Sequence, residues 1–325
     1  MKELLLKLLE RKGEMTVSEL VGELGISRQM IHRLLKALQE EGLVKKLGKP
    51  PVTYYQRTIE SEKEIKFQGE ADEEKEAFLK KHFLLITETG DYHEGLQAMI
   101  AWCRRQKLPI EKTIDEFIKT KRKYLSYVGS NGLISGIDKI NNTKGFDSIG
   151  LDELYYQDFY AIERFGKTRL GTQLHFAKQG QNRTMMKSIT DEIRPNILKL
   201  ISALSIDAVG YIPPTIKREI QIMQVFRNNL NLSLPHLDLI KVKGEVVVPQ
   251  KALSKLEDRI NNARSSIMIG ENRYFRKILL IDDAVGSGAT LNETALKLKR
   301  KGICDTVIGY AVTGSFKGLD VLQEV

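Results

Sequence analysis

Apolar residues in the first forty positions recur at helical spacing in three separate runs. The first run is rich in leucine and stops at Gly13, which predicts a helix with one apolar stripe. The second opens on a capping-box pair, Thr16 and Glu19, and stops at Gly25, which predicts a short helix. A third helix is expected after Ser27, a good N-cap. Its inward positions are expected to be Met30, Ile31, Leu34, Leu35 and Leu38.

After Gly42 the pattern changes from helical spacing to alternation. Residues 43–47 and 52–55 alternate around the turn residues 48–51, which predicts a two-stranded hairpin with a basic tip. Three helices followed by a hairpin is the order of elements in a winged helix. The outer face of the third predicted helix carries polar and basic side chains, namely Arg28, Gln29, His32, Arg33 and Lys36.

Residues 1–58 resemble winged helix-turn-helix DNA-binding domains. The resemblance implies that the third helix faces the major groove of double-stranded DNA, while lysines of the hairpin contact phosphate. The residues assigned to DNA are Ser27, Arg28, Gln29, His32, Arg33, Lys36, Lys45, Lys46 and Lys49. A winged helix that makes only protein contacts, or that forms a homodimer, is the alternative left open.

Charge separates this segment from the rest of the chain. The chain has 51 lysines and arginines against 42 aspartates and glutamates, a formal net charge of +9. Residues 59–77 reverse this excess and are interpreted as an acidic linker. Residues 78–150, including Leu84 to Ile86, have mostly helical spacing and are expected to form a helical connector without chemistry of its own. Trp102 and Cys103 are interpreted as core residues of that connector.

The remaining half of the chain alternates between short strand-like runs and helical runs. Such alternation predicts an α/β domain over residues 151–325, with a mainly parallel sheet flanked by helices. Ligands of such sheets bind at the carboxyl ends of the strands. The expected strands are 159–165, 208–212, 237–242, 277–281 and 307–311, and a helix is expected near 193–204.

The expected strand 277–281 runs into two acids, a glycine-rich turn and a helix that begins near Leu291. Glycines let successive backbone amides converge on an anion, and hydroxyls at a helix N-terminus add donors. Asp282 and Asp283 are acceptors suited to vicinal sugar hydroxyls, with Mg²⁺ able to bridge the rest of the site. An ordinary strand-to-helix turn is the alternative.

This run resembles the signature by which type I phosphoribosyltransferases bind phosphoribosyl pyrophosphate (PRPP). The run comprises Asp282, Asp283, Ala284, Val285, Gly286, Ser287, Gly288, Ala289 and Thr290. The family commonly has two threonines where this chain has Gly286 and Ser287. Residues 248–262 are similar to the flexible loop of competence-protein-F type phosphoribosyltransferases, and residues 210–218 stand where that family has its pyrophosphate loop. The flexible-loop match consists of Gln250, Lys251, Leu253, Ser254, Arg259 and Asn262.

The resemblance implies a type I phosphoribosyltransferase fold with PRPP and Mg²⁺ as ligands. It implies transfer of the phosphoribosyl group to an amine or base, with release of pyrophosphate, coupled to DNA binding. Lys251, Lys255 and Arg259 would then close over the leaving group, and Thr215, Lys217 and Arg218 would hold the pyrophosphate. Asp282 and Asp283 would bind the metal indirectly, through PRPP or water.

Other functions stay open at this stage. The architecture is similar to that of winged-helix purine repressors of Gram-positive bacteria, which implies a transcriptional regulator that senses PRPP without turnover. A DNA-uptake or repair accessory with vestigial catalysis is a further alternative. The cysteine-rich zinc element of the competence-protein-F family is absent here, so that family's biological role does not follow from the resemblance. No segment identifies the acceptor.

Composition narrows the setting. Apolar stretches are too short to cross a bilayer and the N-terminus lacks a charged-then-apolar signal, so membrane and secreted classes are not expected. Two cysteines cannot form a disulfide framework or a four-cysteine zinc site. A cytoplasmic protein without a structural metal is expected.

Overall fold

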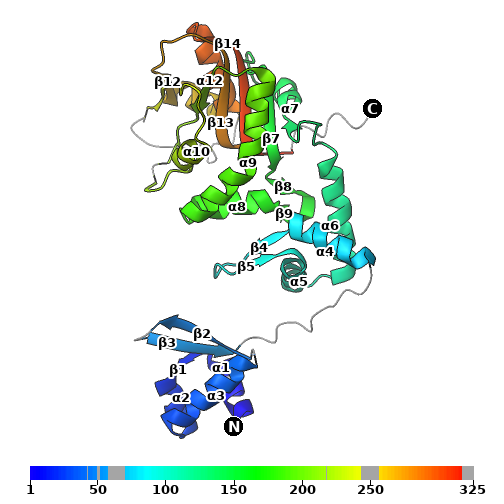
Figure 1. The fold of residues 1–325 in the computed structure, drawn as a ribbon, viewed down its shortest axis with the longest axis vertical. Coiled ribbons are helices and arrows are strands. Elements are labelled where there is room, and N and C mark those ends of the chain that lie inside the picture. The colour runs from blue at the N-terminus through cyan, green and yellow to red at the C-terminus, as the bar shows by residue number, and fades with distance from the viewer. Residues whose placement is uncertain (42, 50–51, 58–69, 217, 243–255, 317–325) are drawn as a thin grey trace. The chain divides into compact units, whose positions relative to one another are not determined.

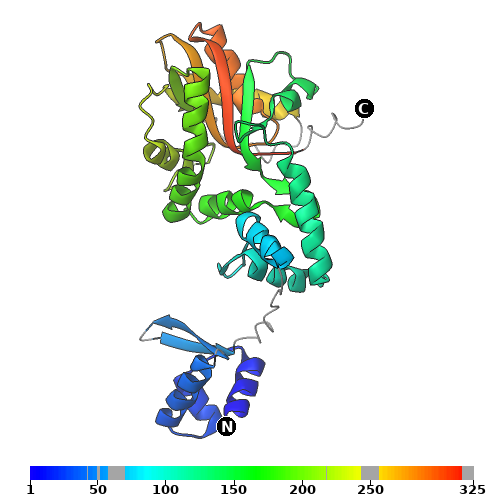
Figure 2. The same cartoon turned by 45° about the vertical axis from the view of Figure 1, so that its right-hand side comes forward.

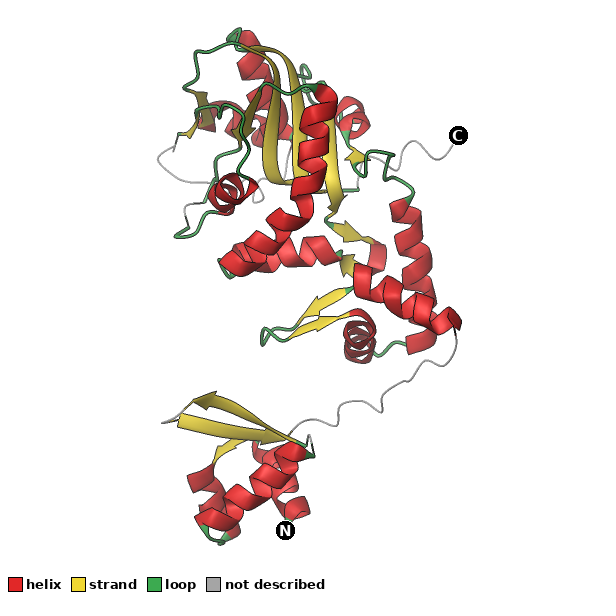
Figure 3. Cartoon of the chain, in the orientation of Figure 1, coloured by secondary structure: helices red, strands yellow, loops and turns green. Residues whose placement is uncertain are grey.

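The computed structural model describes residues 1–316 apart from 42, 50–51, 58–69, 217 and 243–255. The chain divides into two compact units, residues 1–68 and 69–325. Each unit has its own buried core. Figures 1 and 3 show helices and strands in both units.

The first unit contains three helices and a three-stranded antiparallel sheet with strand order β1-β3-β2. Its elements are α1 (Lys2–Lys12), β1 (Glu14–Thr16), α2 (Val17–Leu24), α3 (Arg28–Glu40), β2 (Val44–Lys49) and β3 (Val52–Arg57). The three predicted helices and the hairpin are confirmed, and β1 adds a third strand that was not predicted.

The predicted helix ends of this unit are observed as hydrogen-bonded caps. Gly13 follows α1 with a φ of 84°, in the region that favours glycine. At the start of α2 the Thr16 backbone N–H donates to Glu19 Oε2 at 2.7 Å, and the Glu19 N–H donates to Thr16 Oγ1 at 3.3 Å. At the start of α3 the Met30 N–H donates to Ser27 Oγ at 3.3 Å.

The core of the first unit is a leucine-rich cluster that joins α1, α2, α3 and the sheet. On α3 the buried stripe is Ile31, Leu35 and Leu38, and Leu34 is partly buried. The prediction for Met30 was wrong, because 46% of its surface is exposed. Successive helical residues are about 100° apart, and Met30 lies outside the stripe that Ile31 defines.

The second unit begins with a mixed segment of helices and a short hairpin. Its elements are α4 (Glu70–His82), β4 (Leu84–Ile86), β5 (Tyr92–Glu94), α5 (Gly95–Gln106) and α6 (Ile110–Leu125). The acidic linker predicted for residues 59–77 lies outside the described residues up to 69, and from Glu70 the chain is helical rather than an extended linker.

Residues 84–86 were expected to be helical and are a strand instead. The residues after them form a tight turn: the Thr87 N–H donates to the Asp91 carbonyl at 3.0 Å, and the Asp91 N–H donates to Thr87 Oγ1 at 2.9 Å. This turn pairs the run with β5, because three apolar residues before a turn are too few to maintain a helix. Cys103 is buried, and Trp102 is partly buried and packs on Phe83 and Phe165, so both belong to the packed interior of this segment, as predicted.

The rest of the second unit is built around a five-stranded sheet of order β10-β13-β14-β7-β6. Strands β10, β13, β14 and β7 are parallel, while β6 pairs antiparallel with β7. The prediction of a mainly parallel sheet is therefore confirmed. The elements are β6 (Ile134–Ser135), α7 (Ile137–Asn142), β7 (Glu153–Phe159), β8 (Ala161–Ile162), β9 (Gly166–Lys167), α8 (Arg169–Gln179), α9 (Arg183–Leu204), β10 (Ala208–Tyr211), α10 (Ile222–Leu230), β11 (Leu239–Lys241), α11 (Leu256–Ser266), β12 (Ile267–Ile269), β13 (Phe275–Val285), α12 (Ala289–Arg300) and β14 (Cys304–Gly314).

Helices cover both faces of this sheet. Residues of α8, α9 and α10 pack on one face, against Leu279 and Ile281 of β13 and Ile308 of β14. Figure 2 shows α9 lying along the sheet. Helix α12 packs on the other face, where a Cβ on Gly309 would meet the side chain of Leu291. A helix-covered parallel sheet of this kind presents the carboxyl ends of its strands to ligands.

Several elements differ from the sequence predictions. The strand expected at 237–242 is shortened to β11, which pairs antiparallel with β12 in a separate two-stranded sheet and is not part of the parallel sheet. The strand expected at 277–281 extends from Phe275 to Val285, so Asp282 and Asp283 lie within β13.

The strand expected at 159–165 is wrong, since β7 ends at Phe159 and Glu163 has a φ of 32°, which interrupts an extended run. The connector expected for residues 78–150 contributes β6 and α7 to the sheet region. No described helix is long and apolar enough to cross a membrane.

Candidate functional site

A cavity of about 570 Å³ lies at the carboxyl edge of the parallel sheet. Segments that follow β7, β10, β13 and β14 all contribute to its lining, because parallel strands end at the same edge. Helices α8 and α11 supply further side chains. The lining residues are Tyr160, Lys178, Gln179, 212–216, Arg218, 221–223, Arg259, 282–291 and Ser315.

The two acids of the site are consecutive residues of β13, so their side chains leave opposite faces of the strand. Asp283 is 11% exposed and forms an ion pair with Lys178 at the last turn of α8. Asp282 is half-buried, and its Oδ1 accepts from the Asp283 N–H at 2.7 Å. Burial and the neighbouring Asp283 carboxylate raise the pKa of Asp282 above its ordinary value. The two carboxylates therefore have different electrostatic environments.

The turn after β13 brings backbone amides to the cavity. Gly288 has a φ of 81°, a backbone conformation that favours glycine, and a Cβ there would also displace the end of the Ile140 side chain of α7. Helix α12 begins at Ala289, whose N–H donates to Ser287 Oγ at 3.4 Å. The first amides of a helix lack intrahelical partners and carry partial positive charge. This end of α12 is therefore suited to an anion such as phosphate.

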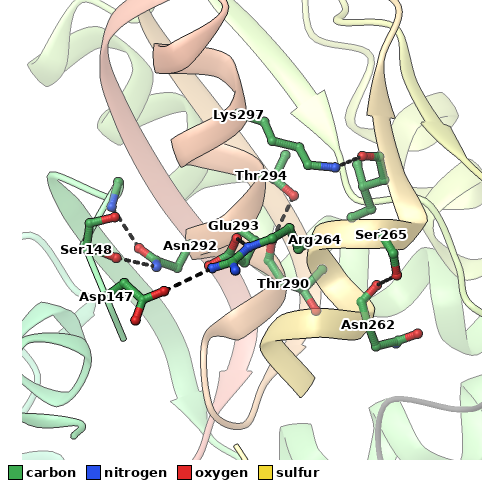
Figure 4. A network of polar contacts seen from close by, with 12 residues as sticks. Asp147, Ser148, Asn262, Arg264, Ser265, Thr290, Asn292, Glu293, Thr294 and Lys297 are labelled. Carbon is green, nitrogen blue, oxygen red and sulfur yellow. Dashed lines mark hydrogen bonds and ion pairs between the residues drawn. The ribbon is translucent and has the colours of Figure 1, made fainter. Parts of the chain in front are cut away.

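Two guanidinium groups approach the same cavity from other elements. Arg218 lies in the segment after β10, and Arg259 lies on α11. Figure 4 shows how α11 is held: Arg264 donates to Glu293 of α12 at 3.0 Å and to Asp147 at 3.4 Å. Glu293 is 3% exposed, so this contact fixes α11 against α12, the helix that begins at the glycine turn.

Asn292, the residue before Glu293 on α12, belongs to the same network. Its Nδ2 donates to the Ser148 carbonyl at 3.0 Å, and its Oδ1 accepts from the Gly150 N–H at 2.8 Å (Figure 4). The segment before β7 is thereby tied to α12. These contacts position the helix whose first turn lines the cavity.

Most of the site residues proposed from the sequence lie together. Thr215, Arg218, Arg259 and residues 282–290 all line the cavity. Lys217, Lys251 and Lys255 lie outside the described residues. The sequence reasoning missed Tyr160, Lys178 and Ser315. Tyr160 and Ser315 directly follow β7 and β14, so correct strand ends would have found them. No sequence signal marks Lys178, because its position at the cavity depends on how α8 packs against the sheet.

The acids at the end of β13 fit a partly hydrated Mg²⁺ whose remaining ligands are waters or a phosphorylated molecule. No described residues form a group of three or more histidine, cysteine or acidic side chains able to hold a metal. Two carboxylates and several hydroxyls do line the cavity. Mg²⁺ commonly keeps several waters and binds through one or two carboxylates plus substrate phosphates, and the donor set is compatible with that arrangement.

In the first unit, the face of α3 opposite its core stripe is polar and basic. Arg28, Gln29, His32 and Arg33 are exposed, as are Ser27 and Met30. Lys36 is exposed, and its Nζ lies 4.0 Å from Oε1 of Glu40. Lys45 and Lys46 are exposed on β2, while the side chain of Lys49 is not among those that the structure describes. The proposed DNA-contacting side chains that are described therefore lie on the surface.

Residues 2–45 match a family model described as winged helix-turn-helix DNA-binding. The match extends from α1 into the start of β2. No curated protein matches the chain. The first unit is thus a winged helix-turn-helix DNA-binding domain.

Proposed function

We propose that the second unit binds PRPP with Mg²⁺ as a phosphoribosyltransferase-like unit, and that the DNA-binding domain couples it to DNA. The proposed reaction transfers the phosphoribosyl group to an amine or base and releases pyrophosphate. A homodimer is compatible with this function but is not required by it.

The composition of one cavity carries this proposal. A glycine turn at a helix N-terminus, two carboxylates and two guanidinium groups line it. These groups suit a phosphate, sugar hydroxyls and a pyrophosphate, respectively. The volume of about 570 Å³ lies within the range of small-molecule sites. Three segments that resemble PRPP-binding segments of the family, within residues 210–218, 248–262 and 282–290, contribute residues to the same cavity. This shared location supports ligand binding most directly.

In the proposed reaction the acceptor nitrogen bonds to the anomeric carbon as the bond from that carbon to pyrophosphate breaks. The acceptor nitrogen loses its proton to solvent, so no nucleophilic side chain is required. The chain contributes positioning. The 286–290 turn would hold the terminal phosphate, Asp282 and Asp283 would accept from ribose hydroxyls, and Arg218, Arg259 and Thr215 would hold pyrophosphate.

Asp282 and Asp283 would hold Mg²⁺ through water or through the ligand. When bound, the cation would neutralise charge on the leaving pyrophosphate. The remaining contacts to the ligand come from the chain itself.

Calorimetry tests the binding step. Wild-type protein is titrated with PRPP in the presence of Mg²⁺ and compared with the double variant Asp282→Asn, Asp283→Asn. We expect the variant to lose about 2–4 kcal/mol of binding free energy, because acceptors for sugar hydroxyls lose their charge. Asp191→Asn, an exposed acid of α9, is the matched control and should bind as the wild type does. No heat with wild type, or equal affinity in the double variant, contradicts the proposal.

A PRPP-sensing transcriptional regulator is the second candidate, favoured by the DNA-binding domain on the same chain. Pyrophosphate release across a panel of amines and nucleobases, with and without duplex DNA, distinguishes the two. Release with one acceptor supports the transferase. PRPP binding without release, together with a PRPP-dependent shift in DNA affinity, supports the sensor. By linkage, DNA must then change PRPP affinity by the same factor.

A further inference from the structure

Three lysines from different helices approach the carboxyl edge of the sheet. Lys121 of α6 is 2% exposed and donates to both carboxylate oxygens of Asp158 at 3.0 Å. Lys139 of α7 is buried and donates to the Ser315 carbonyl at 3.0 Å. Lys178 of α8 pairs with Asp283 and is 28% exposed. Of the three, Lys178 is the one whose side chain lines the cavity.

The difference in burial decides what each lysine is able to do. An ammonium that is 2% exposed and holds both oxygens of a carboxylate has no water to exchange with, so Lys121 is fixed. Lys178 has one bonded carboxylate oxygen, a flexible four-carbon stem and access to the cavity. Its ammonium is able to change partner within the cavity without leaving solvent contact.

We propose that Lys178 is a ligand-binding residue of this cavity, which gives up Asp283 and pairs with the anionic group of the bound ligand. The inference deepens the proposed function, since it rests on the cavity binding a phosphorylated molecule. Two adjacent carboxylates need a nearby positive charge while the site is empty, and Lys178 supplies it to Asp283. A ligand that brings hydroxyl donors to Asp283 removes that need.

The exchange also has a consequence for selectivity. The ligand must offer donors or positive charge to Asp283 and, within reach of one lysine stem, an anion to Lys178. A free sugar satisfies the first condition alone, and an inorganic anion without a bound cation satisfies the second alone. A phosphorylated sugar satisfies both, so this lysine favours ligands that join the two groups.

Titration of the full chain with two simple probes tests this role. Inorganic pyrophosphate in the presence of Mg²⁺ is measured by calorimetry, and Mn²⁺ alone is measured by electron paramagnetic resonance. The variants are Lys178→Met, Lys178→Arg and the control Lys187→Met, an exposed lysine of α9 that pairs with Asp191. We expect Lys178→Met to weaken pyrophosphate about tenfold or more, since a charge-assisted hydrogen bond is lost. The same variant should bind Mn²⁺ more tightly, because Asp283 is left without its ammonium.

Lys178→Arg should keep pyrophosphate affinity close to wild type, and Lys187→Met should change neither probe. Opposite changes for the anion and the cation cannot arise from simple loss of structure. Unchanged pyrophosphate affinity in Lys178→Met, or a parallel loss of both probes, overturns the inference while leaving the proposed function standing. If wild type binds neither pyrophosphate nor PRPP, the proposed function fails and this inference fails with it.

Discussion

The two proposed ligand surfaces of this protein are built in opposite ways. The proposed DNA-contacting face of the first unit comes from one helix and one adjacent strand, with exposed cations within twenty residues of sequence. The cavity of the second unit collects side chains from Tyr160 to Ser315, and its charges are partly buried and paired. An exposed charged surface can therefore be formed by residues close together in sequence. A partly buried site needs oppositely charged side chains from distant parts of the sequence to compensate its charges.

The largest expected effect concerns a buried ion pair of the second unit. Asp158→Asn leaves the Lys121 ammonium buried beside a neutral amide, and we expect a loss of about 3 kcal/mol in the free energy of unfolding. Urea unfolding followed by Trp102 fluorescence measures it, since the chain has one tryptophan and it lies in this unit.

The comparison variant is Lys2→Ala, which removes an exposed ion pair with Glu41 in the first unit. Its cost should be about 0–1 kcal/mol, measured by circular dichroism. Equal costs for the two variants would erase the contrast between buried and exposed charge on which the comparison depends.

The next prediction concerns the DNA-binding face. Arg28→Ala with Arg33→Ala should weaken duplex binding by about 2–3 kcal/mol at fixed salt and reduce the salt dependence, because fewer counterions are released. Gel shifts at several salt concentrations measure both quantities. Lys12→Ala on α1, whose ammonium pairs with Glu23, is the control. If the double variant binds every duplex as wild type does, α3 is not the groove-facing helix.

A pH effect should separate the units. Burial, with Lys121, Lys81 and Arg169 nearby, lowers the pKa of His82 to about 4, below its ordinary 6.5. The folded state therefore favours neutral His82. The corresponding contribution to the free energy of unfolding is fully present above pH 6.5 and is lost as pH falls toward 4. Between pH 7 and 5 we expect the His82 contribution to the free energy of unfolding to fall by about 1–2 kcal/mol. It is measured as the difference between wild type and His82→Gln at each pH, which cancels the titration of other groups of the unit such as Asp282. The same difference at pH 7 and pH 5 would contradict the assignment.

The smallest expected effect tests the local construction of the DNA-binding face. Ser27→Ala removes the side-chain acceptor for the Met30 N–H at the start of α3 and should cost about 1 kcal/mol in the first unit. Ser18→Ala, at an exposed position of α2, should change stability by less than about 0.5 kcal/mol. Thermal unfolding followed by circular dichroism compares them; equal midpoints would show that the cap contributes nothing.

Particular residues show how far sequence reasoning reached. The caps at Thr16 and Ser27 were predicted because a cap is a contact between residues three positions apart. The glycine turn after β13 was also recognised from residues that are close together in sequence. Leu84 to Ile86 were assigned to a helix because a three-residue apolar run has no resolvable period, and the turn after it decided the outcome.

The sequence by itself determined the winged helix, the mainly parallel α/β sheet and the glycine turn, since these depend on apolar period, caps and turn residues close together along the chain. Tertiary structure decided which strand ends meet and that Lys178 reaches Asp283, a residue 105 positions away. It also distinguished the two acids, because Lys178 pairs with Asp283 while burial and the Asp283 carboxylate raise the pKa of Asp282. The physical reason is that burial and electrostatic pairing depend on strand order and helix packing, which no local pattern encodes.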